Sequence, residues 1–458
     1  MYGLGRLPAL WRGLQTSPHH ADMAGWRDTC LTALLEHGIR HVPYVQDLFS
    51  RNGMTSGDVR TVAELTSLPV TTKCALQQAG EARVVAQNIP AHQLLDRSTS
   101  GSTGERMIVK RTWFEERLLN TFRRRAVREY GVTSRDRIGE AHYRIADDPR
   151  DDQTLQRLAH QCGRFRRHVF DTLSDPYAAQ AAAAFDPHIL TGMTGAIARL
   201  IDDAAKGGHL LRPRCVITTG ELLTEPLRQR IAGLGVPLYD VYGCNECNLL
   251  AWQCPQGDNG YHVLDDSVII EILRPDGSNA SQGEWGDVVV TSLFSYAMPI
   301  IRYAVGDIAL QGANRCGCGA PFSTLQAIKG RTIDCFTLGS GRLIHPWEIH
   351  NAIRPHLAGL RQFQMIQTAP DAIDLHVVPL KTLPDGDLQG MQNAGNRVLA
   401  GRALLTVKLV TTIAPGPSGK CQPFVSYRTF PAEERPSIAL LQHDEMKTYE
   451  LWQTYDRR

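Results

Sequence analysis

The segment from residue 216 to residue 241 constrains the fold more than any other part of the chain. It contains a short β-branched run at 216–219, a helical pattern at 225–234, and a β-branched and aromatic run at 237–241. Two strands joined through a helix by such short connections pair in parallel. The segment therefore predicts an α/β protein whose ligands bind at the carboxyl ends of the strands.

The patterns on either side of this segment predict a large N-terminal core. Before it, helices are expected at 24–37, 114–130, 177–185 and 192–205. A further helix is expected after Ser56, where Val59, Val62 and Leu65 recur at helical spacing. After it, strands follow one another without helices, at 268–273, 287–293 and 300–310. This succession predicts an antiparallel subdomain, a small barrel or sheet.

The last third of the chain predicts a second domain of its own. The expected order there is a helix from Pro346, strands at 362–368 and 373–378, a helix from Leu388 and a strand at 407–412. We expect an N-terminal core over residues 1–332 and a small mobile α+β lid over residues 333–458.

Composition excludes several classes of partner. Among 458 residues, 43% are hydrophobic and 21% are charged, with a net charge of only +2. Such a chain is globular and carries no field that would attract nucleic acid or an anionic membrane. The most apolar region, 287–310, is broken by Arg302 and Asp307 and is not expected to span a bilayer. The odd count of 11 cysteines fits a reducing compartment, so we expect a cytoplasmic protein.

A hydroxyl-rich and glycine-rich segment is the first candidate binding element. It consists of Ser98, Thr99, Ser100, Gly101, Ser102, Thr103 and Gly104. Backbone N–H groups and hydroxyl donors can converge there on the oxygens of a phosphate. Apolar residues on both sides predict that the segment links two short strands, whereas a Walker loop needs Gly-Lys-Ser/Thr leading into a helix. An ordinary Ser/Gly turn is the alternative.

Four further motifs follow in order along the chain. They are Gly220-Glu221, Asp240 to Glu246, Arg302 to Asp307, and Gly330 to Asp334. Each alone is a common type of turn. In this order, with the phosphate segment and residues 68–73 ahead of it, they resemble the adenylate-forming superfamily, and its phenylacetate-CoA ligase branch most of all. The resemblance runs from residue 68 to residue 420.

The resemblance implies a role for each motif residue. Residues 98–104 would hold the ATP phosphates, and Gly220, Glu221, Tyr242, Gly243 and Asn245 would line the nucleotide site. Glu246 would bind Mg²⁺, a hard cation that prefers carboxylate oxygen. Asp307 would accept hydrogen bonds from the ribose hydroxyls. Arg331 would donate to the same region, and Asp334 marks the hinge.

Lys420 lies in the turn Gly-Pro-Ser-Gly-Lys near the end of the last domain. The resemblance implies a catalytic lysine there, which bridges the substrate carboxylate and the α-phosphate. A flexible point charge suits two anions that must be brought together. Without the upstream motifs, a solvated surface lysine would be preferred.

The chain also departs from the family pattern. Glu105 and Arg106 follow the phosphate segment where a proline is usual, and Asn245 stands where threonine is common. Asparagine retains an acceptor and two donors, so a contact to phosphate or water can survive. These changes affect the geometry and rate more than the class of reaction.

A second group of residues suggests a structural zinc site. It comprises Cys254, His262, Cys316 and Cys318, a set similar to one that binds zinc in the phenylacetate-CoA ligase branch. Zinc takes four such ligands in closed structural sites. Cys244 and Cys247 form a competing pair, ranked second because Glu246 lies between them. Free buried cysteines are the third alternative.

These features predict an acid–thiol ligase that forms AMP. The carboxylate of an acid, aromatic by resemblance, would attack MgATP, and a thiol would then displace AMP from the acyl-adenylate. The thiol belongs to coenzyme A or to the phosphopantetheine arm of an acyl carrier protein, and the oligomeric state stays open. An amide-forming ligase, a non-catalytic nucleotide-binding relative and a Walker-type ATPase are the alternatives.

Overall fold

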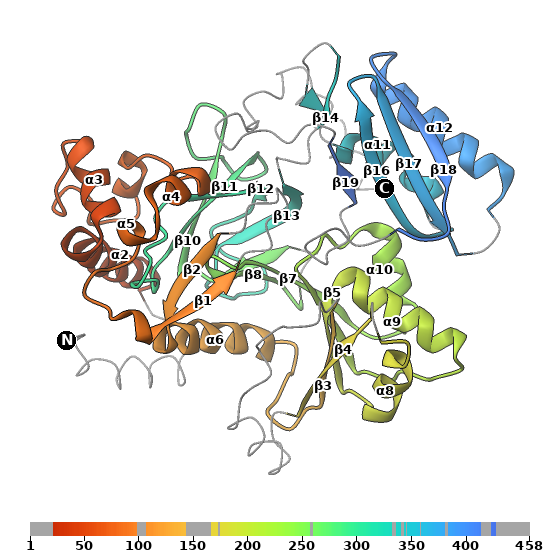
Figure 1. Ribbon diagram of the computed structural model, residues 1–458, viewed down its shortest axis with the longest axis horizontal. Helices are drawn as coiled ribbons and strands as arrows, with labels where there is room; N and C mark the ends of the chain where they lie inside the picture. The colour runs from red at the N-terminus through yellow and green to blue at the C-terminus, as the bar shows by residue number, and fades with distance from the viewer. Residues whose placement is uncertain are drawn as a thin grey trace.

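The computed structural model describes eleven stretches of the chain, and every structural statement below concerns them. They are residues 22–98, 107–142, 166–172, 175–256, 260–331, 336–339, 343–344, 346–357, 359–380, 383–413 and 423–426. Figure 1 shows a large part built around one extended sheet, and a smaller unit, drawn in blue, of helices on a second sheet.

The extended sheet has eleven strands in the order β10-β11-β12-β13-β9-β8-β7-β6-β5-β3-β4. The parallel section holds β3 (Ile138–His142), β4 (Arg167–Asp171), β5 (Ile189–Met193), β6 (Cys215–Thr219) and β7 (Leu238–Cys244). Its pairings confirm the parallel arrangement predicted from residues 216–241.

From β7 onward the same sheet becomes antiparallel. Its strands are β8 (Asn248–Gln253), β9 (Tyr261–Val263), β10 (Val268–Leu273), β11 (Trp285–Ser292), β12 (Tyr303–Gln311) and β13 (Thr324–Arg331). The predicted antiparallel subdomain is therefore confirmed. It continues the parallel sheet through the pairing of β13 with β9 and is not a separate barrel.

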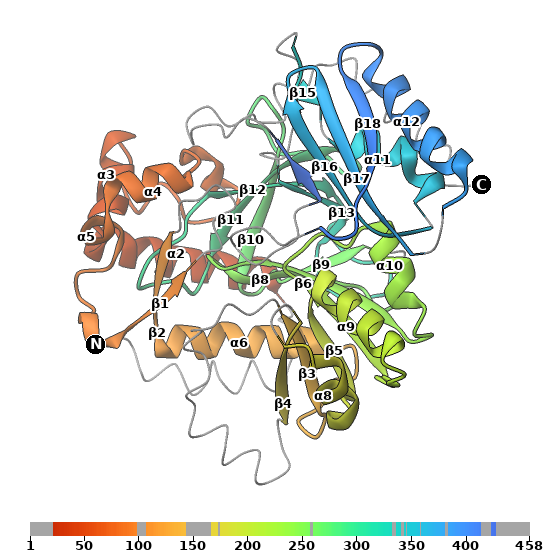
Figure 2. The ribbon, with the colours of Figure 1, turned by 45° about the vertical axis from the view of Figure 1, so that its right-hand side comes forward.

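Helices cover the parallel section of the sheet. They are α8 (Ala178–Phe185), α9 (Thr194–Lys206) and α10 (Glu225–Ala232). The alanines of α8 and the apolar face of α9 form a buried cluster with strand residues such as Val216 and Leu190. Figure 2 shows these three helices beside β3 to β6. A fourth helix, α6 (Trp113–Arg128), contributes Leu118 and Phe122 to the larger core.

The N-terminal residues are mainly helical, as predicted. They form α2 (Met23–His41), α3 (Pro43–Arg51), α4 (Lys73–Ala79) and α5 (Glu81–Val84), with short 3-10 helices η1 (Glu64–Ser67) and η2 (Ala91–Gln93).

The helix predicted after Ser56 is wrong, because turns lead there into η1. Asp58 accepts hydrogen bonds from the backbone and hydroxyl of Thr55, and the Glu64 carboxylate accepts from the backbones of Arg60 and Thr61. Such local bonds compete with a helix.

The smaller unit has a hydrophobic core of its own, from Phe336 to Phe424. Its four-stranded sheet has the order β18-β17-β16-β19. The strands are β16 (Leu360–Ala369), β17 (Ala372–Pro379), β18 (Leu404–Leu409) and β19 (Phe424–Val425), accompanied by α11 (Pro346–Ile353), α12 (Asp385–Leu399), the 3-10 helix η5 (Arg354–His356) and a two-stranded sheet of β14 (Phe336–Thr337) and β15 (Leu343–Ile344).

The two units meet at a small ionic cluster. Asp202 of α9 lies between Arg230 of α10 and Arg361 of β16, with 3.0 Å from Arg361 Nε to Asp202 Oδ2. The side chains of Asp202 and Arg230 are largely buried. The smaller unit is therefore anchored to the helices that cover the parallel strands.

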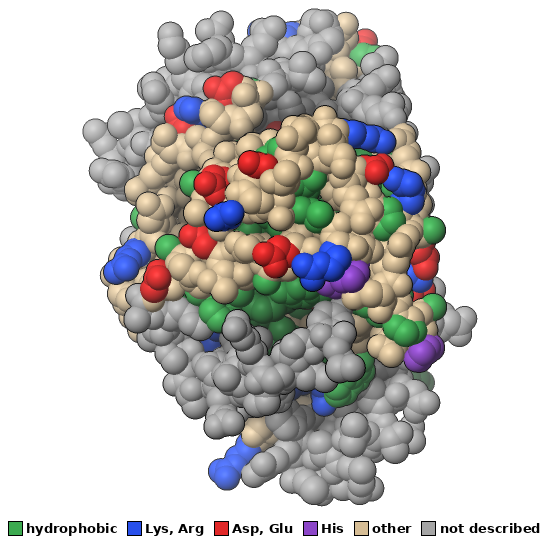
Figure 3. Space-filling view, turned by 90° about the vertical axis from the view of Figure 1, so that its left-hand side faces the viewer, with side chains coloured by type: hydrophobic (Ala, Val, Ile, Leu, Met, Phe, Trp, Pro, Cys, Tyr) green, Lys and Arg blue, Asp and Glu red, His purple; other side chains and the backbone are tan. Residues whose placement is uncertain are grey.

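No described helix combines the length and apolar character needed to cross a membrane. On the described area of the face in Figure 3, acidic and basic side chains are interspersed. The expected cytoplasmic location stays a prediction.

Arg302 connects the start of β12 to the N-terminal helices. Its guanidinium binds both carboxylate oxygens of Glu271, at 2.9 and 3.0 Å, and donates to the carbonyls of Thr66 and Leu68. Both charged side chains are at most 7% exposed.

We expect Arg302→Met to lower the free energy of unfolding by about 3–5 kcal/mol, because Glu271 would keep an unpaired buried charge. Urea denaturation measures this loss. Arg274→Met is the control, since the partly exposed Arg274–Glu284 pair is expected to contribute less than about 1 kcal/mol. Equal losses in the two variants would contradict the prediction.

Candidate active site

The motif residues Tyr242 and Asp307 lie in contact although 65 positions separate them in the chain. Tyr242 lies in β7 and Asp307 in β12. The Tyr242 hydroxyl donates a hydrogen bond of 2.6 Å to Asp307 Oδ2. An ionised carboxylate accepts several hydrogen bonds, so Asp307 retains capacity for further donors. The structure thus brings two residues of the predicted nucleotide site together.

A second contact joins the same two regions. Glu246 lies in the turn between β7 and β8, and its Oε1 accepts a hydrogen bond of 3.0 Å from the Tyr303 hydroxyl. Glu246 is 9% exposed and Tyr303 is 2% exposed. Burial raises the pKa of Tyr303, and the neighbouring charge of Glu246 raises it further, so the phenol acts as a donor.

Glycine is required where β7 turns into β8. A Cβ on Gly243 would lie 2.4 Å from the carbonyl oxygen of Asn248. This close approach lets the chain fold back tightly and places Asn245 and Glu246 in the intervening turn.

Gly220 and Glu221 follow β6, beside the end of β7. Gly220 has a φ of 77°, a left-handed conformation that favours glycine. Glu221 Oε2 accepts a hydrogen bond of 2.8 Å from the backbone N–H of Gly195, in the first turn of α9. A carboxylate is stabilised at a helix N-terminus. Glu221 therefore orders the loop next to the predicted base pocket.

The segment at residues 68–73 lies beside β12. The Thr71 backbone N–H donates to the Arg302 carbonyl at 2.8 Å, and the Ala304 N–H donates to the Thr71 carbonyl at 2.9 Å. These bonds form a parallel bridge between Thr71 and Tyr303. The segment that precedes the phosphate motif in the sequence is therefore next to the strand that carries Asp307.

Several predicted residues lie partly or wholly outside the described residues. Ser98 ends β1 (Leu94–Ser98), which pairs with β2 (Ile108–Thr112), so the two predicted flanking strands are confirmed. Arg331 ends β13 opposite Asp307, with only its backbone described. The residues outside the description are Thr99, Ser100, Gly101, Ser102, Thr103, Gly104, Glu105, Arg106, Asp334 and Lys420.

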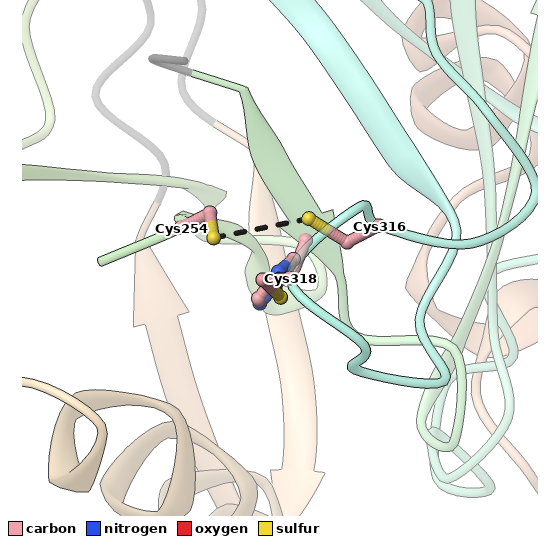
Figure 4. Close-up of side chains that lie close together, drawn as sticks. Cys254, Cys316 and Cys318 are labelled. Carbon is pink, nitrogen blue, oxygen red and sulfur yellow. Dashed lines mark hydrogen bonds between the residues drawn. The ribbon is translucent and has the colours of Figure 1, made fainter. Parts of the chain in front are cut away.

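The four residues of the predicted zinc site converge. Cys254 follows β8, His262 lies in β9, and Cys316 and Cys318 lie between β12 and β13. Their ligand atoms all lie within 4.8 Å of one another. Cys316 Sγ is 3.8 Å from Cys254 Sγ (Figure 4). Cys318 Sγ is 3.3 Å from His262 Nε2.

These distances suit a tetrahedral metal. With zinc–sulfur bonds of about 2.3 Å, two sulfur ligands stand roughly 3.8 Å apart. Burial raises the pKa of the Cys316 thiol, but the Cys318 N–H and His262 lower it more, to about 7. The other ring nitrogen of His262, Nδ1, lies 3.5 Å from Glu129 Oε2. A carboxylate in this position commonly orients a metal-binding histidine.

Glu129, Tyr303 and Arg111 were not selected as functional residues by sequence reasoning. Tyr303 lies within the motif Arg302 to Asp307, but the resemblance implies no role for it. Arg111 lies in β2, and its guanidinium donates to the carbonyl oxygen of Asn245 at 2.5 Å. Neither Arg111 nor Glu129 had a motif signal, because the site residues that they contact, Asn245 and His262, lie more than one hundred positions away.

Comparison with solved structures identifies the fold. The chain superimposes on 2-hydroxyisobutyryl-CoA ligase in its postadenylation state, bound to 2-HIB-AMP, with a TM-score of 0.72 and 19% identity over 88% of this chain and 89% of that one. The thioesterification state of the same enzyme gives 0.60, with 20% identity over 89% and 90% of the two chains. The protein has the fold of adenylate-forming CoA ligases.

Comparison of sequences supports a particular branch of these enzymes. Phenylacetate-coenzyme A ligase from Thermus thermophilus is 31% identical over 28% of this chain and 29% of its own length. The Escherichia coli and Pseudomonas putida enzymes are 24% and 23% identical, over 60% and 75% of this chain.

The alignments span 29% and 64% of the Thermus and Escherichia coli enzymes, less than two thirds of each. No family model matches the chain. The similarity to phenylacetate-coenzyme A ligases nevertheless supports the branch that the motifs suggested.

Proposed function

We propose that the protein activates a carboxylic acid with MgATP, forming an acyl-adenylate and pyrophosphate, and then transfers the acyl group to a thiol. The observation that carries the proposal is the paired contact of Tyr242 with Asp307 and of Tyr303 with Glu246. It gathers residues from two distant motifs at the carboxyl end of β7, where an α/β sheet binds ligands.

The residue types of the candidate site suit the roles proposed for them in this reaction. Asp307 would hold the ribose hydroxyls, and Arg331, opposite it in β13, would donate to the same region. Glu246 offers a carboxylate to Mg²⁺, which takes one or two protein carboxylates together with substrate phosphates. A bound Mg²⁺ would neutralise phosphate charge. Residues 98–104 would bind the phosphates, between β1 and β2.

We assign residues 1–332 to the core and residues 333–458 to a lid that brings Lys420 to the reacting groups. Support comes from the separate hydrophobic core of the smaller unit. Lys420 would stabilise the charge that develops as the carboxylate attacks the α-phosphate.

The acid is proposed to be aromatic, and coenzyme A is the preferred thiol. Both follow from the sequence relatives, which are phenylacetate-coenzyme A ligases. An acyl carrier protein and an amine are the alternative acceptors. Mass analysis of reactions with phenylacetate, ATP and each acceptor tests this assignment. An aryl-CoA thioester formed with equimolar AMP supports the assignment. If a product forms only with a carrier protein or only with an amine, that compound is the acceptor and coenzyme A is not.

We further propose that Cys254, His262, Cys316 and Cys318 bind one structural zinc ion. The site would tie β8 and β9 to the connection between β12 and β13, which leads to Arg331. All four ligands come from the protein, as in closed structural sites.

We expect Cys316→Ser to lose the metal and to lower the melting temperature by several degrees, because structural zinc contributes folding free energy. Metal analysis of the purified protein and a thermal melt measure both effects. Cys74→Ser, at a partly exposed cysteine outside the cluster, is the control. If wild-type protein that was purified without chelators contained no metal, the assignment would be contradicted.

A further inference from the structure

The turn that carries Glu246 is held from three sides by side chains with no assigned role in the chemistry. Arg111 of β2 donates to the Asn245 carbonyl at 2.5 Å. Tyr303 of β12 donates to Glu246 Oε1 at 3.0 Å. From α6, Asn120 Oδ1 accepts a hydrogen bond of 3.3 Å from Asn248 Nδ2. A turn between two strands is thus fixed to three other elements.

Arg111 also lies in one of the two strands that border the predicted phosphate segment. Its NH1 lies 3.1 Å from Glu116 Oε2, while Arg97 NH2 lies 3.2 Å from Glu116 Oε1. Arg97 lies in β1 and Arg111 in β2, the two strands that border residues 99–107. One carboxylate of α6 therefore binds an arginine from each of these strands, and Arg111 also binds the residue before Glu246.

Burial strengthens the ion pair between Arg111 and Glu116. The Arg111 side chain is 3% exposed and that of Glu116 is 17% exposed. Burial raises the pKa of the Glu116 carboxyl, but Arg111 and Arg97 outweigh this effect and lower it, so the carboxylate stays ionised. Charge-assisted hydrogen bonds away from water are shorter and stronger than neutral ones. A planar guanidinium can bind two acceptors in fixed directions, which a lysine ammonium cannot do equally well.

We propose that Arg111 and Tyr303 are positioning residues, which hold Glu246 at a fixed place relative to strands β1 and β2 so that one divalent cation can bind the carboxylate and the ATP phosphates together. Tyr303 binds one carboxylate oxygen and leaves the other to serve as a ligand. Arg111 fixes the backbone of the turn to the strands that carry the phosphate segment. The proposal rests on the proposed function, since it takes Glu246 as a ligand of the cation.

The test measures cation binding directly. The protein, in molar excess over ATP and without acid, is titrated with Mn²⁺, free Mn²⁺ is followed by its electron paramagnetic resonance signal, and the same titration of ATP alone is subtracted. We expect Tyr303→Phe and Arg111→Lys each to raise the apparent Kd for Mn²⁺ by about tenfold, the typical effect of removing a group that orients a metal ligand. Adenylate formation is also followed as acid-dependent ATP–pyrophosphate exchange. The concentration of Mg²⁺ that gives half-maximal exchange should rise in parallel with the Kd for Mn²⁺.

Tyr261→Phe is the matched control. Tyr261 is also buried, and its hydroxyl donates to a carboxylate, that of Asp240, at 2.8 Å. This change removes a buried tyrosine–carboxylate bond without touching Glu246, and Mn²⁺ affinity should stay within about twofold of the wild type. Thermal melts verify that each variant is folded. If Arg111→Lys fails to fold, Tyr303→Phe and Glu116→Gln decide the test.

The outcomes separate this proposal from the proposed function. Wild-type Mn²⁺ affinity in Tyr303→Phe and Arg111→Lys overturns it, even where activity falls, because the residues would then be structural only. An equal loss of affinity in Tyr261→Phe overturns it as well. Absence of acid-dependent exchange in the wild type would instead count against the proposed function, whatever the cation titration gives.

Discussion

Glu246→Gln is expected to lower the rate of acid-dependent ATP–pyrophosphate exchange by about 100-fold or more. Glutamine keeps the size of the side chain and can still accept from the Tyr303 hydroxyl, but it loses the charge that suits Mg²⁺. Exchange at saturating ATP, acid and Mg²⁺ measures the effect. The buried position of Glu246, at 9% exposure, means that water cannot easily replace the missing carboxylate.

Glu284→Gln is the control for this change. Glu284 is partly exposed and lies 3.5 Å from Arg274, in a surface pair expected to contribute little. Its exchange rate should stay within about twofold of the wild type. If Glu246→Gln retained more than half of the wild-type rate, Glu246 would not be a ligand of the catalytic cation.

Lys420→Ala should lower the same exchange by about 100- to 1,000-fold, the usual cost of removing a group that stabilises charge in a transition state. The second step should be spared, because the lysine is assigned to adenylation only. Thiol transfer from a chemically prepared acyl-adenylate should therefore keep most of its rate. The two half-reactions are measured separately, by exchange and by thioester release.

Lys408→Ala provides the comparison within the same domain. Lys408 is half exposed and pairs with Asp374 at 2.6 Å, away from any motif. Both half-reactions should continue in this variant. An exchange rate in Lys420→Ala equal to that of Lys408→Ala would exclude the assigned role and would favour a surface lysine at position 420.

Local patterns predicted the elements of the fold better than their boundaries. The parallel pairing around β6 and β7 followed from residues 216–241 because short connections leave few alternatives. The helix expected after Ser56 does not form, since Asp58 and Glu64 bind the backbone locally. The strand β5 takes Met193, so α9 begins at Thr194, two residues later than expected.

In the candidate site, the motif residues were predicted but their contacts were not. The order of the motifs gave the family resemblance that selected Tyr242, Glu246 and Asp307, and the zinc ligands were selected by residue type together with the same resemblance. Their partners could not be predicted in this way. The contacts of Tyr303 with Glu246 and of Arg111 with Asn245 join residues 57 and 134 positions apart, and they depend on how the strands are ordered in the sheet.

The central claim is that an acid reacts with ATP to form an adenylate. Its most direct test is ATP–pyrophosphate exchange in the wild-type protein with MgATP and a panel of aromatic and aliphatic acids. The account predicts exchange that depends on an acid, is strongest with aromatic acids and is accompanied by AMP when a thiol is added. Background exchange with every acid, or release of phosphate without any acid, would contradict it.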